Sequence, residues 1–329
     1  MHSRLRKILI ICVVTLLVTG LVLSVGCGKP KEEPSPITPP APSPAELSAT
    51  LVPNMDLDLY VYIKQEKPTV IPSNVVGQPG VEAESLAVWG FSAGEVSAIG
   101  GALVLTTASQ ASSVYGQIPA QPERWTKLSD RTIYFVYGTG SAAEALKTAI
   151  NNQNFKYYDD EKGLSAVRTL PNSGSTKLAG VMVARPDKPL IGNVIKETDP
   201  QAFGMVDMII KVARLEVIAG GLYSPDQINV GEVTQAFEKG TVSNLNAGIL
   251  ITLNIGLPGF AIEPIVGKLL TENQFTKVTV GNITVYKGVQ TTSQGEKLSI
   301  AIRVEGSTIF AALSGKEAYA ETLVTGVKM

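Results

Sequence analysis

The chain offers few residues for the commonest kinds of catalysis. Its 329 residues include one histidine, His2, and two cysteines, Cys12 and Cys27, and all three lie within the first 27 positions. A Ser-His-Asp triad needs a histidine base, a Cys-His pair needs both residue types, and zinc sites draw mainly on the same side chains. The sequence beyond Cys27 excludes these sites, and we expect no catalytic residue, no bound metal and no cofactor.

Carboxylates remain, and two groups of them stand out. Asp159, Asp160 and Glu161 form an acidic run, whereas a two-carboxylate hydrolase needs acids that face each other across the substrate. Asp56 and Asp58 alternate with apolar residues in the stretch 51–63, which predicts one half-buried strand. Two carboxylates on one strand face can share a hard cation, but no third oxygen ligand follows nearby. We interpret the run as a solvated turn and the pair as a solvated strand face.

A glycine-rich corner follows the predicted strand 132–137. The stretch 138–143 has the pattern GxGxxA, and the acidic run comes about twenty residues later. This order is typical of dinucleotide-binding folds, in which glycines let backbone amides approach a pyrophosphate. Ser141 and Glu144, however, have the spacing of a capping box, which would satisfy the same amides. We therefore favour a capped structural corner.

Aromatic residues gather in one part of the chain. Tyr134, Tyr137, Phe155, Tyr157 and Tyr158 fall within 25 residues of one another. Successive residues of a strand point to opposite faces, so one of Tyr157 and Tyr158 should be exposed while part of the group is core. Several rings on an open face would form a platform for a sugar or a peptide.

The first 27 residues have the layout of a secretion signal. Arg4, Arg6 and Lys7 precede an apolar run at 8–25, which ends in the sequence LSVGC at 23–27. This ending resembles the lipobox of bacterial lipoprotein signal peptides and implies that Cys27 is lipidated, although serine stands where that box usually has leucine. The alternative is an uncleaved N-terminal membrane helix. Both interpretations place the domain outside the cell and tether it to the membrane.

The next segment predicts a spacer. Prolines are dense in 28–46, so this tether should be extended and should hold the domain away from the bilayer. Removal of the three basic leader residues changes the formal net charge from -1 to -4. A mildly acidic domain without a basic run is a poor nucleic-acid binder, and we expect no nucleic-acid partner.

The chain resembles itself at an offset of 120 residues. The stretch 275–304 is similar to the stretch that begins at Phe155, and the pair Gly100-Gly101 corresponds to Gly220-Gly221. A helical apolar stripe also recurs, as Ala142, Ala145, Leu146, Ala149 and Ile150 and then as Ile262, Ile265, Val266, Leu269 and Leu270. We predict a tandem duplication of a 120-residue unit.

Each unit is predicted to run strand, helix, strand, helix, about four strands and a closing helix, at 201–212 in the first copy and 316–324 in the second. The strands include 164–168 and its counterpart 283–287. The fold class is α+β, each unit being a mixed, mainly antiparallel sheet with helices packed on one face. The predicted segments are a signal at 1–27, a tether at 28–46, a lead-in of strand and loop at 47–94 with its loop at 65–84, and repeat units at 95–213 and 214–329.

These features indicate a lipid-anchored envelope protein that faces the extracytoplasmic side. We expect a non-enzymatic binding or scaffold module whose ligand is an envelope polymer, a peptide or a protein. The alternative is a carboxylate-based hydrolase of an envelope or extracellular substrate. A ligand-binding site is sought first where the first copy departs from the second.

Overall fold

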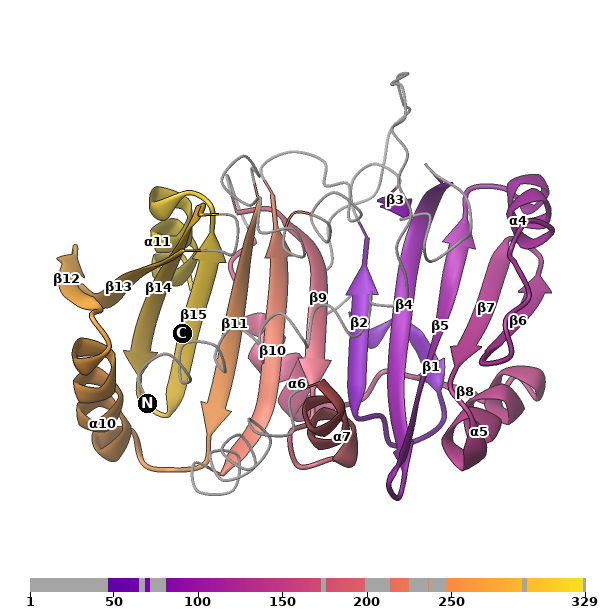
Figure 1. Ribbon diagram of the computed structural model, residues 1–329, viewed down its shortest axis with the longest axis horizontal. Coiled ribbons are helices and arrows are strands. Elements are labelled where there is room, and N and C mark those ends of the chain that lie inside the picture. The colour runs from indigo at the N-terminus through magenta and orange to yellow at the C-terminus, as the bar shows by residue number, and fades with distance from the viewer. Residues whose placement is uncertain are drawn as a thin grey trace.

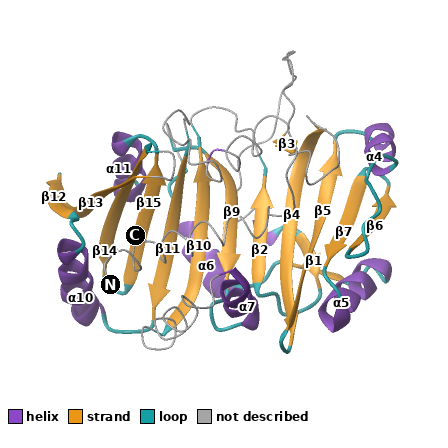
Figure 2. Ribbon diagram, in the orientation of Figure 1, coloured by secondary structure: helices purple, strands orange, loops and turns teal. Residues whose placement is uncertain are grey.

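The computed structural model describes residues 47–64, 69–71, 81–172, 176–198, 214–224, 236, 247–291 and 295–327. The fold is α+β, a large sheet with helices and a small second sheet (Figures 1 and 2). The signal with Cys27, the tether and the predicted helix at 201–212 lie outside the described residues.

One antiparallel sheet dominates the described chain. It has thirteen strands in the order β12-β13-β14-β15-β11-β10-β9-β2-β4-β5-β7-β6, with β3 paired to β4. The strands are β2 (Leu59–Ile63), β3 (Thr69–Ile71), β4 (Val81–Ala93), β5 (Val96–Leu105), β6 (Arg124–Ser129), β7 (Thr132–Tyr137), β9 (Leu178–Ala184), β10 (Leu215–Tyr223), β11 (Gly248–Ile255), β12 (Thr276–Val280), β13 (Ile283–Thr291), β14 (Lys297–Glu305) and β15 (Thr308–Ser314). Strands up to β9 form one half and later strands the other, as the colours of Figure 1 show. Every pairing among them is antiparallel, so the expected mixed sheet is not found here.

Helices cover both faces of this sheet, and the prediction of helices on one face is wrong. The described helices are α4 (Ala108–Tyr115), α5 (Gly140–Asn151), α6 (Glu161–Arg168), α7 (Pro189–Thr198), α10 (Gly259–Glu272) and α11 (Glu317–Thr325). The side chains of α5, α6 and α11 join one core cluster with Tyr60, Trp89 and Phe310. The side chains of α4, α7 and α10 pack against strand residues that point the other way. None of the described helices is long and apolar enough to cross a bilayer.

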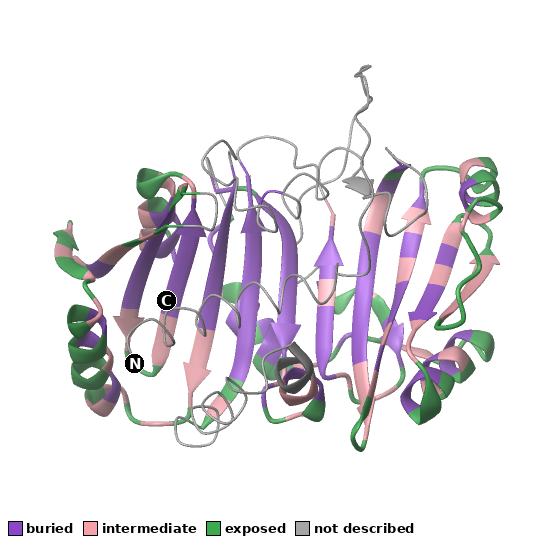
Figure 3. Cartoon of the chain, viewed as in Figure 1, coloured by how far each residue is buried: buried purple, intermediate pink, exposed green. Residues whose placement is uncertain are grey.

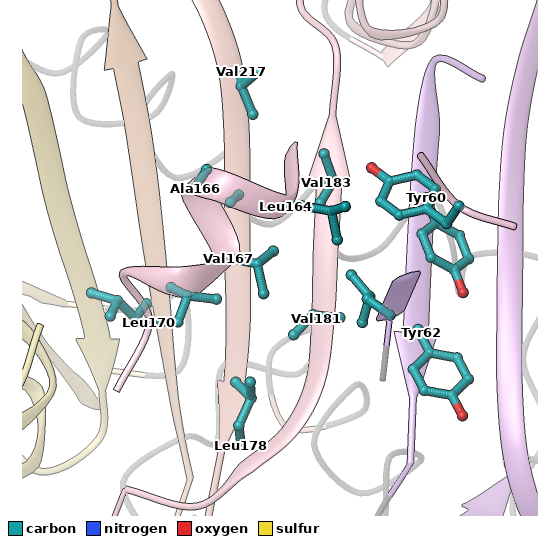
Figure 4. Close-up of a cluster of buried hydrophobic side chains, with 14 of the residues drawn as sticks. Tyr60, Tyr62, Leu164, Ala166, Val167, Leu170, Leu178, Val181, Val183 and Val217 are labelled. Atoms are coloured by element: carbon teal, nitrogen blue, oxygen red, sulfur yellow. The ribbon is translucent and has the colours of Figure 1, made fainter. Parts of the chain in front are cut away.

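The central strands are buried on both sides, as Figure 3 shows. All seven residues of β9 are buried, because α6 lies on one face and the α7 side of the core on the other. Figure 4 shows α6 lying across β10 and β9, with Leu164 next to β9 and Val167 between the two strands, and both belong to one cluster with Val181 and Val183. A strand that is buried on both faces has apolar or small residues at every position, and β9 has this pattern.

The N-terminal lead-in differs from its prediction. The stretch 51–63 is not one strand, because β1 (Leu51–Pro53) pairs with β8 (Phe155–Tyr157) in a separate two-stranded sheet and β2 begins only at Leu59. The expected loop at 65–84 contains β3 and the start of β4, a strand of the central sheet. The lead-in therefore contributes to the main core.

The glycine corner begins α5 without the expected capping box. Gly138 and Gly140 have φ of 125° and 74°, a region open mainly to glycine, so local turn geometry explains these residues. Thr139 occupies the N-cap position of α5, but its side chain makes no capping hydrogen bond. Glu144 instead pairs with Lys147 at 2.7 Å.

The correspondence at an offset of 120 residues holds for part of the predicted unit. Three elements occur at matching places in the two copies: strand β5 matches β10, strand β7 matches β11, and helix α5 matches α10. In each copy the two matching strands pair with each other, β5 with β7 and β10 with β11. The stretch 283–287 lies in β13, but its predicted counterpart 164–168 lies in helix α6, so the prediction of a strand at 164–168 is wrong. A duplication of the whole unit is not confirmed. The predicted closing helix at 316–324 is confirmed as α11.

The predicted helical stripe of the second copy is only partly buried. Ile262 and Leu270 are buried, but Ile265 and Leu269 are exposed. In the first copy, Ala142, Leu146 and Ile150 are all buried on the side of α5 that faces the sheet. The apolar stripe thus predicted both helices, although it predicted the buried face of only one.

The two adjacent glycines of β5 should respond differently to substitution. A Cβ at Gly101 would lie 2.2 Å from Phe135 Cζ and 2.5 Å from the Ala87 carbonyl oxygen, whereas at Gly100 its nearest atom is 3.4 Å away. We expect Gly101→Ala to lower the free energy of unfolding by about 1–3 kcal/mol because the core is overpacked. The matched control Gly100→Ala should leave it unchanged or raise it by up to about 1 kcal/mol. Urea denaturation measures both, and equal losses would contradict this account of the packing.

Candidate functional site

The candidate site lies on the sheet face that carries α5 and α6. A pocket of about 370 Å³, here called the β2–α6 pocket, is lined by the loop before β2, the β8–α6 corner and the end of β9. Its charged lining residues are Asp56, Asp58, Lys156, Asp159, Asp160 and Arg185. The two acidic groups that are about one hundred residues apart in the sequence therefore line one pocket, which the sequence did not predict.

Asp58 is the most buried acid of the pocket. The residue is 2% exposed, and its Oδ2 accepts a hydrogen bond from the backbone N–H of Leu190 at 3.0 Å. Lys188, the residue before α7, has no side-chain acceptor that could cap the helix. The Asp58 carboxylate, from a distant segment, takes that role by accepting from the first turn of α7. Burial raises the pKa of Asp58, while hydrogen bonds from Ser92 and Leu190 and the Lys188 charge oppose the rise. The prediction of a solvated strand face is wrong for Asp58.

Helix α7 is also held to the β4–β5 hairpin. Asn193 Nδ2 donates to Ser97 Oγ at 2.8 Å and to the Glu95 carbonyl at 3.1 Å. A Cβ at Gly90 would lie 2.3 Å from Leu190, so the helix approaches the sheet closely there. The Asp58 carboxylate therefore joins one wall of the pocket to a helix on the opposite face of the sheet.

Asp160 forms the corner between β8 and α6. Its Oδ1 accepts from Gly163 N at 3.1 Å as the N-cap of α6 and lies 3.8 Å from Arg185 Nη1. Arg185 also donates twice to the Asp187 carboxylate, at 3.2 Å each. The acidic run is therefore more than a solvated turn, because one of its members begins a helix and contributes to the pocket wall.

The outer acids of the pocket are also paired. Lys156 Nζ lies 2.8 Å from Asp159 Oδ1, and Lys188 pairs with Asp56, whose side chain is 72% exposed. The solvated interpretation thus fits Asp56. The pocket lining as a whole holds four aspartates against one lysine and one arginine, which gives it a negative excess of two.

Two tyrosines form the floor of the pocket. The rings of Tyr60 and Tyr158 lie 4.6 Å apart, and the Tyr60 hydroxyl is 2.6 Å from Thr50 Oγ1. Burial raises the pKa of both, and the Asp160 charge adds to the rise for Tyr158. The Tyr158 hydroxyl therefore stays protonated and donates to Asp160 Oδ2 at 3.4 Å.

The five aromatic residues that the sequence grouped do not share an open face. Tyr158 is 6% exposed and Tyr157 is 64% exposed, which confirms that one of the two faces solvent. Phe155 packs against Tyr134 at 5.9 Å and against Trp89 at 6.0 Å, and belongs to the core margin. Tyr157 has Leu51 as its exposed cross-strand neighbour in the small sheet, with no second exposed ring of the group beside it among the described residues.

A second cavity adjoins the first. This α5 cavity, also about 370 Å³, is lined by Asn54, Met55, Glu144, Ala145, Thr148, Ala149, Asn152 and Asn154. Asn54 and Met55 line both cavities, so the loop that carries them separates two parts of one depression. The small sheet of β1 and β8 positions this loop, because Asn54 N donates to the Asn154 carbonyl at 2.9 Å.

The chemistry of the site is that of polar recognition. Each aspartate of the β2–α6 pocket already has a hydrogen-bonding or ionic partner, which fixes its position. Among the described residues, no three acidic, histidine or cysteine side chains come together to hold a metal ion. The site presents carboxylates, amides and cations at defined positions around a cavity of the size that small ligands occupy.

Comparison with known proteins gives no family for the chain. No family model and no curated protein matches it. Among solved structures, crystal form I of TP0453 covers 85% of this chain and all of its own, at 11% identity and a TM-score of 0.34. Crystal form IV of TP0453 covers 84% and 98%, at 8% identity and a TM-score of 0.33. Likenesses at these scores carry no argument about function.

Substitution of Asp58 tests its role as a cap. Asp58→Ala leaves the Leu190 amide unpaired, so we expect the free energy of unfolding to fall by about 1–3 kcal/mol at neutral pH. Asp58→Asn keeps an oxygen acceptor and should lose much less. Urea denaturation of the three proteins measures the difference, and an equally destabilised Asn variant would contradict capping.

The raised pKa of Asp58 also predicts a pH dependence. The folded protein binds this proton more tightly than the unfolded chain does, so the contribution of Asp58 to stability falls as the pH rises from 3.8 through the raised pKa. Above that pKa the contribution is constant. The difference in unfolding free energy between wild type and Asp58→Asn, measured across this range, should show the fall. A difference that does not change with pH would contradict the raised pKa.

Proposed function

We propose that the chain is a lipid-anchored extracytoplasmic envelope protein whose folded domain is a binding module. The signal ending in Cys27 and the Pro-rich tether support the anchoring. The observation that carries the binding function is the β2–α6 pocket, which gathers charged side chains from three separate segments into one cavity. The envelope therefore supplies the ligand, and the tether gives the domain its reach.

The pairing of the pocket acids favours binding over hydrolysis. A carboxylate-based hydrolase would be favoured by the presence of Asp58 and Asp160 in one pocket, with the pKa of Asp58 raised. Both carboxylates, however, already accept backbone hydrogen bonds that begin α7 and α6. A general acid or nucleophile needs an oxygen directed at the substrate. A binding wall requires only that its side chains be fixed, and these bonds fix them.

We also propose that an ancestral duplication built the frame of the domain. Strands β5 and β10 run in the same direction, four places apart in the sheet, and each is followed on its outer side by β7 or β11. Gly100 faces the α5 side, whereas Gly220 faces Met182 on the opposite side. A twofold axis parallel to the strands would relate β5 to β10, because rotation about it keeps the strand direction and exchanges the two faces of the sheet. The pocket lies beyond the matching part, where α6 stands in place of a strand.

Recovery of a partner tests the binding proposal. The full-length protein, with its tether intact, is used to capture partners from detergent-solubilised envelope. We expect Lys156→Ala to reduce recovery at least several-fold, because Lys156 lines the pocket and its surface ion pair contributes only about 1 kcal/mol or less to stability. The matched control Lys162→Ala breaks a surface pair with Glu216 outside the pocket and should not change recovery. Absence of any protein or glycan partner would contradict the proposal.

Substitution at the lipobox tests the anchor. Cys27→Ala removes the acceptor of the lipid, so the precursor should remain unprocessed at full length and its mass should show no acyl chains. Immunoblotting of whole cells and mass spectrometry measure the two effects. Normal processing of this variant would overturn the lipidation of Cys27.

A further inference from the structure

The β2–α6 pocket and the α5 cavity together have the shape of a site for an extended ligand. Each is about 370 Å³, and Asn54 and Met55 belong to both walls. A ligand that fills one cavity and continues over this loop enters the other. A compact ligand would use one cavity and leave the second without a role.

Three of the five polar side chains that line the α5 cavity are primary amides, those of Asn54, Asn152 and Asn154; the other two are Glu144 and Thr148. Asn54 Nδ2 donates to Asn154 Oδ1 at 3.2 Å. The Asn54 Oδ1, the Asn154 Nδ2 and the whole Asn152 amide find no partner among the described residues. An amide offers a donor and an acceptor in one plane, which suits hydroxyl groups because a hydroxyl both donates and accepts.

The charge of the walls restricts the ligand further. The β2–α6 pocket has a negative excess of two, and Glu144 is the charged residue that lines the α5 cavity. Like charges repel, so an anionic polymer is disfavoured. A peptide bound in extended form gains most from the backbone groups of a strand edge, whereas the argument here rests on side chains, namely amides, carboxylates and the cations of Lys156 and Arg185.

We infer that this two-part depression binds a linear, hydroxyl-rich oligosaccharide without negative charge, with sugar units in both cavities. The inference rests on the proposed binding function and specifies its ligand. Asn152 and Asn154 hold the units in the α5 cavity, and the paired charges around Lys156 and Arg185 hold those in the β2–α6 pocket.

Calorimetric titration of the detergent-solubilised full chain tests the inference. The probes are neutral β-linked oligomers of N-acetylglucosamine and of glucose, from one to six units, with polylysine as the cationic peptide. Affinity should rise about tenfold once an oligomer is long enough to occupy both cavities. Asn152→Ala combined with Asn154→Ala should abolish this rise and leave the affinity for the shortest binding oligomer unchanged. Gln117→Ala, in the turn that follows α4 on the opposite face of the sheet, is the control and should change neither.

The outcomes separate this inference from the function on which it rests. Affinity that is independent of oligomer length, or a rise that survives the double substitution, would overturn the two-cavity site. Binding of polylysine without binding of the sugars would overturn the sugar ligand and leave a binding module for cationic peptides. If neither probe binds while the envelope capture still yields a Lys156-dependent partner, the inference alone fails. If that capture also yields nothing, both fail.

Discussion

The structure depends on one strand pairing at its centre. Strand β9 is the last strand of the first half of the sheet, and β10 is the first of the second half; six residue pairs join them, including Ala219 with Val183. This pairing makes two halves into one continuous sheet. Because the joined strands lie far from either edge, their side chains are buried on both faces, and each face needs its own layer of helices.

The same burial explains how the site is held. Beside β9, the Tyr60 and Tyr158 rings and the side chains of α6 fill the core on one face. The polar groups at the end of β9 and before β2 must then find partners at the margin of this core. Asp58 finds the start of α7, and Asp160 finds the start of α6 and the Arg185 side chain. The pocket is the space that remains between these fixed groups.

The sequence predicted local elements better than their arrangement. The apolar stripe of α5, the turn glycines at 138 and 140 and the helix α11 all follow from short-range patterns. The site does not, because Asp58 and Leu190 are 132 residues apart and no periodicity relates them. The burial of Asp58 could not be predicted from the sequence either, because it depends on the same distant helix. Alternation with apolar neighbours suggested a strand face, whereas the residue stands just before β2 and turns inward to a helix end.

The failed prediction of a one-sided sheet has a geometric cause. Side chains alternate along a strand, so two equivalent strands that run in the same direction present equivalent residues on opposite faces only if one is turned about its own axis. Strands β5 and β10 stand in that relation, and so do the helices that follow: α5 covers the face of Trp89, and α10 covers the opposite face. Within each half, moreover, helices lie on both faces, because α4 and α7 lie opposite α5 and α6, and α10 lies opposite α11. The apolar stripe of a helix shows that the helix packs against a sheet but not which face of the sheet it covers, so the sequence could not place these helices.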